Sequence, residues 1–310
     1  AKKLSTKKKL NKNSFVVEAG SNDGTFLNTI KNFSKAKVLG IDPSKNVSIL
    51  AKKKGVTTII DFFSLGLAKK IVKKFTKADL FYGANVFNHS DNITDFLKAA
   101  KEVIKYDGLI VLEVPDLESL IKKAGFDTIY HEHRNYFSEN SIRKLFYKHK
   151  MEVHKIEKIN YMSGSLRVYA KNNQNNFKKI KTKTISLSKI NQFEKNMIII
   201  RKTIIQFIYK MKKENKIIAG IGAATKGNTL LNFCNLSSDH IDYILDKSKL
   251  KIGKYTPGSA IKIVDEKKYK NFQALIILPW NISSFLIKKF VKKSKRPYIS
   301  VQNIVKKLKK

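Results

Sequence analysis

The sequence predicts two α/β domains in succession, each built around a largely parallel sheet. Short apolar strand patterns alternate with amphipathic stretches of about ten residues, which is typical of a doubly wound sheet. A glycine-containing turn follows the first strand directly, and a similar turn opens the second half of the chain after one long helix. A length of 310 residues allows each domain its own hydrophobic core.

The first domain is expected to cover residues 1–172. Short runs rich in Val, Ile, Leu and Phe predict its strands, and apolar residues three or four positions apart predict the helices between them. Its last two strands are expected to close the sheet as an antiparallel edge. In chain order we expect strands at 15–18, 38–41, 57–60, 79–82, 109–114, 152–158 and 165–170, with helices from about 26 and at 47–54, 66–75 and 93–104.

Residues 173–213 are predicted to connect the two domains. The asparagine-rich stretch 172–176 has the composition of a linker. Beyond it, six apolar residues recur at alternating steps of four and three, which predicts one apolar stripe on a long helix that packs on a neighbouring domain. These residues are Phe193, Met197, Ile200, Ile204, Phe207 and Met211.

The second α/β domain is expected to cover residues 214–310. It should contain strands at 217–220, 241–245, 274–278 and 298–301, by the same criteria as the first domain. Its first strand enters the second glycine-rich turn. The two halves therefore share a strand, glycine turn and helix at their beginnings.

The composition is strongly basic, with a formal net charge of +39. Such a charge can indicate a partner that is a nucleic acid or an acidic membrane. However, only five of the 63 basic residues are arginine, the side chain best suited to bidentate phosphate and base contacts. We therefore attribute the charge to lysine at solvated positions, as an A/T-rich coding bias would produce, and expect no nucleic-acid or membrane partner.

Three further observations limit the class of protein. The single cysteine, Cys234, excludes an internal disulfide and a zinc cluster built on thiolates. No apolar run reaches the roughly 18 residues of a membrane span. The basic first residues lack the apolar core of a signal peptide. We expect a cytoplasmic protein, monomeric or homodimeric.

The loop between the first strand and its helix has the features of a cofactor site. Glycines at 20 and 24 allow close backbone approach, and the following helix offers free N–H donors. The spacing is not that of a dinucleotide-binding loop. Two carboxylates in the loop would repel a pyrophosphate but suit a cationic amino acid or sulfonium, and the acid ending the second strand suits a ribose diol. S-adenosylmethionine is therefore favoured over NAD, with Glu18, Gly20, Ser21, Asn22, Asp23, Gly24, Asp42, Pro43 and Asn85 as its expected contacts.

Two histidine-containing segments should lie at the carboxyl edge of the same sheet, where ligands bind in such folds. The first carries His89 after the fourth strand, and the second is Tyr130-His131-Glu132-His133. The second segment suits acid–base chemistry, with a histidine as base and a carboxylate or phenol orienting it. A metal site and a structural hydrogen-bond cluster are the alternatives, although no third ligand is obvious nearby.

These segments together resemble the sugar C-methyltransferases that act on nucleotide-linked 4-keto-6-deoxy sugars. The resemblance runs through the chain from about Phe15 in order and spacing. Its most specific parts are Tyr130 to His133 and Gly222-Ala223-Ala224-Thr225-Lys226-Gly227. The matching segments are 18–27, 40–44, 85–89, 126–133, 164–169, 222–231, Asp246 and 255–258.

The resemblance implies a fold, a cofactor and a mechanism. The first domain should be a Rossmann-like class I methyltransferase domain that binds S-adenosylmethionine, and the second a smaller Rossmann-like domain. A base removes the proton on the sugar carbon next to the ketone, and the resulting enolate carbon attacks the methyl group of the sulfonium. His133 is the implied base, assisted by Tyr130, Glu132 and His89.

The second domain is expected to bind the nucleotide-linked sugar. Its glycine turn follows a strand and opens a helix, which is a plausible seat for phosphate, although such a turn can also serve packing alone. The expected substrate contacts are Gly222, Lys226, Asn228 and, from the first domain, Arg167. An O- or N-methyltransferase and a non-catalytic homologue are the alternative functions.

One expectation of the family is not met by this sequence. The resemblance implies a small cysteine-rich zinc-binding domain before the first strand. Only about 14 residues precede that strand here, and they contain no cysteine. We therefore expect either a fragment or a member that lacks this domain, and no metal site.

Overall fold

The computed structural model describes residues 1–160, 164–172, 184–279, 282–291 and 296–308. The chain divides into two compact units. Unit 1 comprises Ala1–Glu118 and Glu132–Thr184, and unit 2 comprises Ser119–His131 and Ile185–Lys310. Most of the predicted asparagine-rich linker, from 173 onward, lies outside the described residues.

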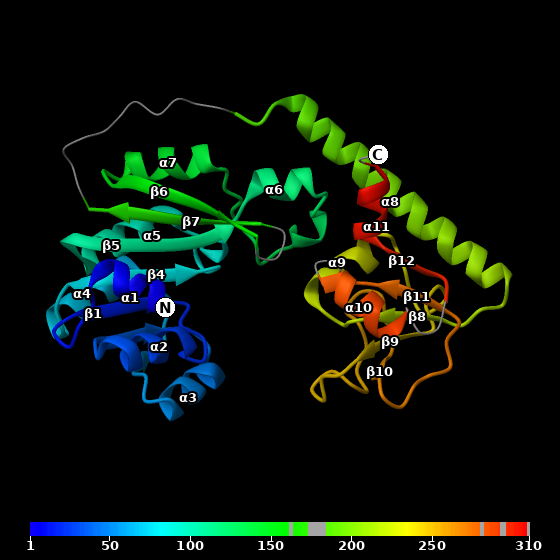
Figure 1. Cartoon of the computed structure of the whole chain (residues 1–310), viewed down its shortest axis with the longest axis horizontal. Coiled ribbons are helices and arrows are strands. Elements are labelled where there is room, and N and C mark those ends of the chain that lie inside the picture. The colour runs from blue at the N-terminus through cyan, green and yellow to red at the C-terminus, as the bar shows by residue number, and fades with distance from the viewer. Residues whose placement is uncertain (161–163, 173–183, 280–281, 292–295, 309–310) are drawn as a thin grey trace. The chain divides into compact units, whose positions relative to one another are not determined.

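Unit 1 contains a seven-stranded sheet in the order β3-β2-β1-β4-β5-β7-β6 (Figure 1). β1 to β5 are parallel, whereas β7 runs antiparallel to both β5 and β6. The predicted doubly wound sheet with an antiparallel edge is therefore confirmed. The strands are β1 (Phe15–Ala19), β2 (Lys37–Ile41), β3 (Thr58–Ile59), β4 (Ala78–Ala84), β5 (Ile104–Pro115), β6 (Glu152–Ile159) and β7 (Ser165–Lys171).

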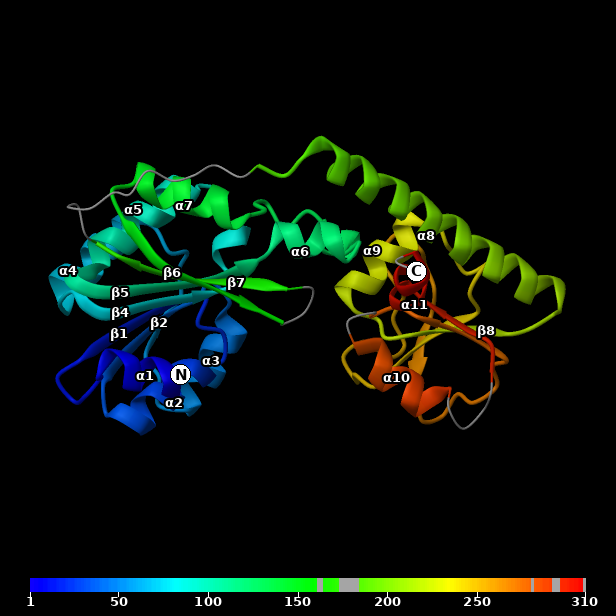
Figure 2. The ribbon, with the colours of Figure 1, turned by 45° about the horizontal axis from the view of Figure 1, so that its top comes forward.

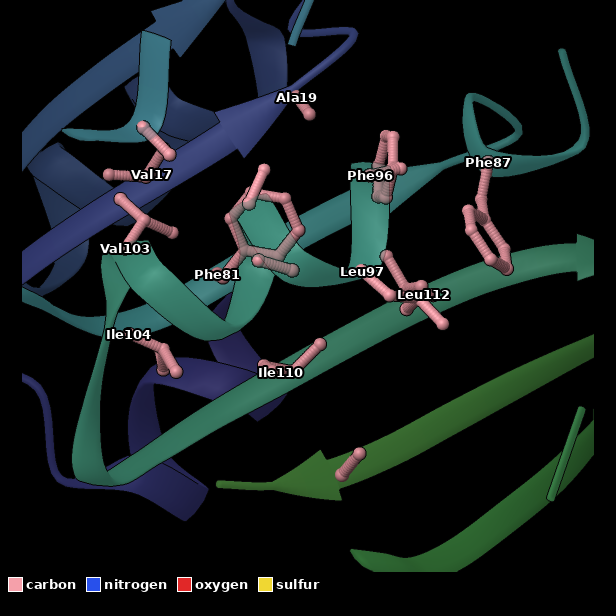
Figure 3. Packing of buried hydrophobic residues seen from close by; sticks show 14 of the residues in the cluster. Val17, Ala19, Phe81, Phe87, Phe96, Leu97, Val103, Ile104, Ile110 and Leu112 are labelled. Atoms are coloured by element: carbon pink, nitrogen blue, oxygen red, sulfur yellow. The ribbon is translucent and has the colours of Figure 1, made fainter. Parts of the chain in front are cut away.

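Helices cover both faces of this sheet, and each face has its own core. One core joins the sheet to α4, α5 and α7, and Figure 3 shows Phe81, Phe96 and Leu112 converging in it. The other core joins the opposite face to α1 and α2 through Leu4, Leu27 and neighbouring residues. The helical elements are α1 (Lys2–Lys8), α2 (Thr25–Ser34), α3 (Lys45–Lys53), α4 (Leu65–Lys74), η1 (Phe87–His89), α5 (Ile93–Val103) and α7 (Glu139–Lys148).

Unit 2 contains a five-stranded parallel sheet in the order β10-β9-β8-β11-β12. α8, α9 and α11 cover one face, as Figure 2 shows, and α10 packs on the other. The predicted second α/β domain is thus present. Its elements are α8 (Leu187–Lys213), β8 (Ile218–Ile221), α9 (Thr225–Phe233), β9 (Tyr243–Asp246), β10 (Ile263–Asp265), β11 (Ala274–Ile277), α10 (Ser283–Phe290), β12 (Tyr298–Ser300) and α11 (Val301–Leu308).

The long helix predicted from an apolar stripe is α8. Ile200, Ile204 and Met211 are buried in the core of unit 2, and the other stripe residues pack against that core while partly exposed. The helix is therefore part of unit 2 itself, not a separate connection.

Residues 119–131 differ from the expected domain division. We expected them in the first domain, but they pack with unit 2. α6 (Leu117–Lys122) begins before this segment and η2 (Phe126–Thr128) lies within it. Ala124 and Phe126 belong to the core that also contains Ile204 and Leu230. The segment therefore belongs to unit 2 because its apolar side chains are buried in the core of that unit, although the chain on both sides of it belongs to unit 1 or leads back to it.

Several features were not predicted from the sequence, including α10 and α11 of unit 2. α1 and β10 have only seven and three residues, too few for a period to stand out. α7 was not predicted either, although a capping box of Ser138 and Ser141 begins it. β5 begins at Ile104 directly after α5, so its first residues read as part of the helix.

Among the residues that the structure describes, no helix combines the length and hydropathy that a membrane span requires. Over the same residues, no group of three or more His, Cys, Asp or Glu side chains could hold a metal ion.

Candidate active site

The glycine loop of unit 1 forms a tight cradle after β1. Gly20 and Gly24 have φ angles of 66° and 72°, in the left-handed region that favours glycine. A Cβ atom on Gly20 would lie 3.0 Å from the Cβ of Val86, and one on Gly24 would lie 3.0 Å from the Cβ of Ala51. Side chains at these two positions would therefore crowd Val86 and Ala51 and strain the backbone of the loop.

Glu18, at the carboxyl end of β1, is a buried acid with an exposed fraction of 5%. Its Oε2 atom accepts no hydrogen bond from any described residue. Burial raises the pKa of this carboxyl group well above its ordinary range, and the nearby Asp42 and Asp23 raise it further. A bound cation would supply the missing partner and favour the ionised form.

Asp42 follows β2 and holds two loops together. Its Oδ2 atom accepts a hydrogen bond from the Asn22 N–H at 2.9 Å, and its Oδ1 atom accepts one from the Ser44 N–H at 2.9 Å. Pro43, between the two, is exposed. Asp42 therefore fixes the glycine loop, and a carboxylate retains acceptor capacity beyond these two bonds.

The Asp23 carboxylate of the glycine loop is paired with a lysine. Lys54 Nζ lies 2.5 Å from Asp23 Oδ2 and donates to Thr25 Oγ1 at 2.7 Å. The hydrogen bond from Lys54, followed by the one that the Thr25 hydroxyl donates to Asp23 Oδ2, lowers the pKa of Asp23. Of the two loop carboxylates that suggested a cationic ligand, only Glu18 is without a cationic partner among the described residues' ion pairs.

The loop after β4 connects the glycine cradle to the histidines. Asn85 has a φ of 51° and donates its N–H to the Glu113 carbonyl at 2.8 Å. Val86 is the residue against which Gly20 packs. Phe87, in η1, stacks on Phe137 with ring centroids 5.0 Å apart. This loop is therefore anchored to the cradle on one side and to the 132–137 segment on the other.

The structure brings His89 and His133 together. Their ring centroids lie 4.9 Å apart with the planes at 71°. Backbone and side-chain bonds fix the two segments that carry them: the Asn135 N–H donates to the Asn88 carbonyl at 3.0 Å, and Arg134 Nε lies 2.7 Å from Asp91 Oδ1. Both rings are half-buried at the carboxyl edge of the unit-1 sheet.

The four-residue segment Tyr130 to His133 is divided by the boundary between the units. Tyr130 and His131 belong to unit 2, whereas Glu132 and His133 belong to unit 1. Residues 131 and 132 form a turn. The ring of Tyr130 lies 6.3 Å from that of His131, and the ring of His133 lies 6.4 Å from that of Tyr136.

Arg167, an expected substrate contact, is engaged by acids of unit 1. Its Nε atom donates to Glu113 Oε1 at 2.7 Å, and its Nη1 atom lies 3.7 Å from Glu157 Oε2. The hydroxyl of Tyr82 donates to the same Glu113 oxygen at 2.7 Å. Burial, followed by the charge of Glu113, raises the pKa of Tyr82 far above its ordinary value.

Unit 2 repeats the backbone pattern of the unit-1 cradle. The Gly222 N–H donates to the Leu245 carbonyl at 2.8 Å, as the Gly20 N–H donates to Ile41. Asp246 accepts hydrogen bonds from the N–H groups of Ala223 and Ser248, both at 2.8 Å, as Asp42 does from its own two loops. Each unit thus presents a glycine turn and an acid after its second strand.

The expected substrate residues of unit 2 line the beginning of α9. Gly222 has a φ of 88°, and a Cβ atom there would lie 2.8 Å from Pro279 Cγ. Burial lowers the pKa of Lys226, and the charge of Asp127 opposes this effect. Asn228 has a buried Oδ1 atom that accepts no hydrogen bond from a described residue.

Sequence reasoning missed three residues of these sites. Lys54 is one lysine among 63 basic residues, and nothing in the sequence marks it as the partner of Asp23. Glu113 was read only as part of a strand. Asn88 is fully buried, with both side-chain amide atoms lacking a hydrogen-bond partner among the described residues. A polar residue flanked by Phe87 and His89 was the available signal for Asn88.

Known proteins are similar to this chain over most of its length. Residues 2–156 match the model of a methyltransferase domain, and residues 161–297 match that of the C-methyltransferase C-terminal domain. C-methyltransferase NovU of Streptomyces niveus is 30% identical over 285 residues, which cover 88% of this chain and 68% of that protein.

Solved structures also match, over about half of the chain. A SAM-dependent methyltransferase from Anabaena variabilis matches with a TM-score of 0.43 and 14% identity, over 52% of this chain and 78% of that one. An S-adenosylmethionine-dependent methyltransferase from Mesorhizobium loti matches with a TM-score of 0.41 and 10% identity, over 51% and 90%.

Proposed function

Since this chain belongs to the S-adenosylmethionine-dependent C-methyltransferase family, we propose that it methylates the carbon next to the ketone of a nucleotide-linked keto-deoxy sugar. The observation that carries this proposal is the pair His89 and His133, whose rings meet beside the loop that packs on the glycine cradle. A base at this place can remove the weakly acidic proton that a ketone activates.

The residues of the unit-1 cradle fit S-adenosylmethionine. The buried Glu18 carboxylate offers an acceptor for the ammonium group, and Asp42 offers one for the ribose hydroxyls. Gly20 and Gly24 give the loop its left-handed turns, and Ser21, Asn22 and Asn85 are proposed to contact the ligand. When bound, this cofactor supplies an electrophilic methyl group.

His133 is the proposed base, and His89 is its proposed partner. A neutral imidazole suits proton removal at neutral pH, and contact with a second imidazole fixes the ring and can share the proton taken up. Glu132 and Tyr130 are proposed to orient the base or to stabilise negative charge on the ketone oxygen.

The nucleotide part of the substrate is proposed to bind unit 2 at Gly222 and Asn228. The N–H groups at the beginning of α9 suit a diphosphate, and the buried Asn228 oxygen lacks a partner that a ligand could provide. Arg167 was expected to contact the substrate, but its bond to Glu113 supports a duty within unit 1 instead.

Proton removal can be tested without methyl transfer. The chain is incubated in deuterium oxide with S-adenosylhomocysteine and a panel of nucleotide-linked 4-keto-6-deoxy sugars. We expect deuterium at the carbon next to the ketone, detected by mass spectrometry, and loss of this exchange in His133→Asn. His154→Gln, at an exposed position of β6, is the control and should exchange like the wild type.

Methyl transfer to the same compounds is then measured with labelled S-adenosylmethionine. Label on carbon supports the proposal, whereas label on oxygen or nitrogen would assign an O- or N-methyltransferase. Binding of S-adenosylhomocysteine without exchange or transfer on any keto sugar would reject the proposed substrate class.

A further inference from the structure

The glycine loop of unit 1 is tied to α3 by a lysine. Lys54 directly follows α3, and its Nζ atom lies 2.5 Å from Asp23 Oδ2 and donates to Thr25 Oγ1 at 2.7 Å. The Thr25 hydroxyl in turn donates to Asp23 Oδ2 at 3.0 Å. The three side chains therefore form a closed ring of hydrogen bonds between the end of α3 and the beginning of α2.

Two further contacts join the same segments. Gly24 lies against α3, since a Cβ atom there would be 3.0 Å from the Ala51 Cβ. Lys31, in the last turn of α2, donates from its Nζ atom to the Gly55 carbonyl at 2.8 Å. Residues 54–55 are thus bonded to the beginning and to the last turn of α2, so α3 supports the glycine loop from behind.

The Asp23 carboxylate is engaged by its neighbours on both oxygens. Oδ1 accepts the Thr25 N–H at 3.1 Å, and Oδ2 accepts the bonds from Lys54 and from the Thr25 hydroxyl. The ammonium of Lys54 balances its charge, and a carboxylate that is already paired attracts a second cation weakly. Glu18 Oε2 is buried and has no hydrogen-bond partner among the described residues. Asp23 therefore holds the loop, whereas Glu18 can still accept a bond from a cationic ligand.

The position of Asp23 is linked to that of Asp42 through the residue between the two bonds. The Asp23 N–H donates to Asn22 Oδ1 at 2.7 Å, and the Asn22 N–H donates to Asp42 Oδ2 at 2.9 Å. A displacement of Asp23 therefore disturbs the carboxylate that is proposed to bind the ribose of the cofactor.

We propose that Lys54 and Asp23 are positioning residues for S-adenosylmethionine, and that Glu18 is the acid of the loop that meets its ammonium group. Lys54 holds Asp23 in place and so fixes the backbone of residues 20–24 before the cofactor binds. A loop that is ordered in advance loses less conformational entropy on binding. This inference rests on the proposed seat of the cofactor in the unit-1 cradle, and the identity of the methyl acceptor does not enter it.

Two ligands distinguish positioning from direct contact. S-Adenosylhomocysteine carries the ammonium group, whereas 5′-methylthioadenosine shares its adenosine and sulfur but lacks the amino-acid part. The Kd of each ligand is measured by calorimetry. Glu18→Gln should weaken S-adenosylhomocysteine about tenfold and leave 5′-methylthioadenosine unchanged. Lys54→Met and Asp23→Asn should weaken both ligands by the same factor, about threefold to fivefold, because the loop and the ribose seat serve both.

A second measurement requires no ligand. Hydrogen–deuterium exchange of residues 20–25 in the unliganded chain should be about threefold faster in Lys54→Met and Asp23→Asn than in the wild type. Lys54→Arg should restore both the exchange and the two Kd values. Lys53→Met, at the exposed last position of α3, is the matched control and should behave like the wild type throughout. The double variant Asp23→Asn, Lys54→Met should lose no more than the worse single variant.

Three results would overturn the proposal. Asp23→Asn could weaken S-adenosylhomocysteine alone, as is expected of Glu18→Gln, which would make Asp23 a direct contact of the ammonium group. Lys54→Met could behave like Lys53→Met in both measurements. Exchange could become faster while both Kd values stay at those of the wild type, which would make the tether purely structural. A wild-type chain that binds S-adenosylhomocysteine but is inactive on keto sugars would reject the proposed substrate and leave these measurements unaffected.

Discussion

The imidazole rings of His89 and His133 meet edge to face, although 44 positions of sequence separate them. η1 carries the first ring, and the segment that returns from unit 2 into unit 1 carries the second. The contact lies within unit 1, so it can be tested through the two side chains alone.

The two histidines should act as one unit in proton removal. We expect His89→Gln to slow the exchange reaction at least tenfold and His133→Gln to slow it more. Because both remove the same function, the double variant should lose no more than His133→Gln, a non-additivity typical of residues that work together. Rates of deuterium incorporation measure this, and additive losses would show that the histidines act independently.

Asp42 should be required for cofactor binding, and Asp246 should not. Removal of its carboxylate leaves the N–H groups of Asn22 and Ser44 without their acceptor, and a ribose loses a partner. We expect Asp42→Ala to weaken binding of S-adenosylhomocysteine at least tenfold, about 1.4 kcal/mol, by calorimetry. Asp246→Ala removes the equivalent carboxylate of unit 2 and should bind like the wild type. NADH should bind neither to the wild type nor to the two variants.

Glu18→Gln should stabilise the unliganded chain and weaken cofactor binding. The pKa of Glu18 is raised in the folded state, so its contribution is favourable below the unfolded pKa and is lost as pH rises through the folded pKa. The variant should therefore unfold at a higher temperature than the wild type at pH 8, by a free energy on the order of 1 kcal/mol, and at the same temperature near pH 4. Equal melting temperatures at pH 8 would contradict this account.

Lys54→Met should destabilise unit 1 modestly and in a pH-dependent manner. The hydrogen bond from Lys54 lowers the pKa of Asp23, so the stabilisation is present above the unfolded pKa and is lost as pH falls through the folded one. Both groups are about one-third exposed, so we expect about 0.2–1 kcal/mol at pH 7 and almost nothing at pH 2. Denaturant unfolding measures the difference, and Lys53→Met, at an exposed neighbouring position, should show none.

Asn88→Leu should leave the stability of the folded chain unchanged or increase it. The side-chain amide is fully buried and forms no hydrogen bond with a described residue, so an apolar side chain of similar volume removes an unfavourable group. We expect a change between zero and about +1 kcal/mol in the free energy of unfolding. A loss of 2 kcal/mol or more would mean that the amide has a partner within the folded chain.

The parts of the fold that could be predicted from the sequence are those whose residues are contiguous in the chain. β1, the glycine turn and α2 are contiguous, and so are α8 and its apolar stripe, so patterns of period two and 3.6 reveal them. The cradle residues Glu18, Gly20 and Asp42 could be predicted in the same way. Each lies at or directly after the end of a predicted strand, and the ends of parallel strands meet at the carboxyl edge of the sheet.

The remaining features depend on contacts between distant segments. Lys54 meets Asp23 only because α3 ends beside the glycine loop, and Arg167 meets Glu113 only because β7 pairs with β5. No sequence period predicts such pairings. Because lysine is abundant throughout the chain, the sequence does not single out Lys54 as the partner of Asp23. The packing of residues 119–131 with unit 2 likewise depends on distant contacts, because Ala124 and Phe126 are buried among residues far along the chain.

The interleaving of the units also bears on synthesis at the ribosome. Phe126 emerges about a hundred residues before Phe233, the ring it finally meets, so the core of unit 2 cannot close until α9 has been translated. Until then an apolar turn stays exposed while the strands of unit 1 on both sides of it can already pair. A nascent chain at this stage offers a binding site for chaperones, and slow translation between α8 and α9 would lengthen the exposure.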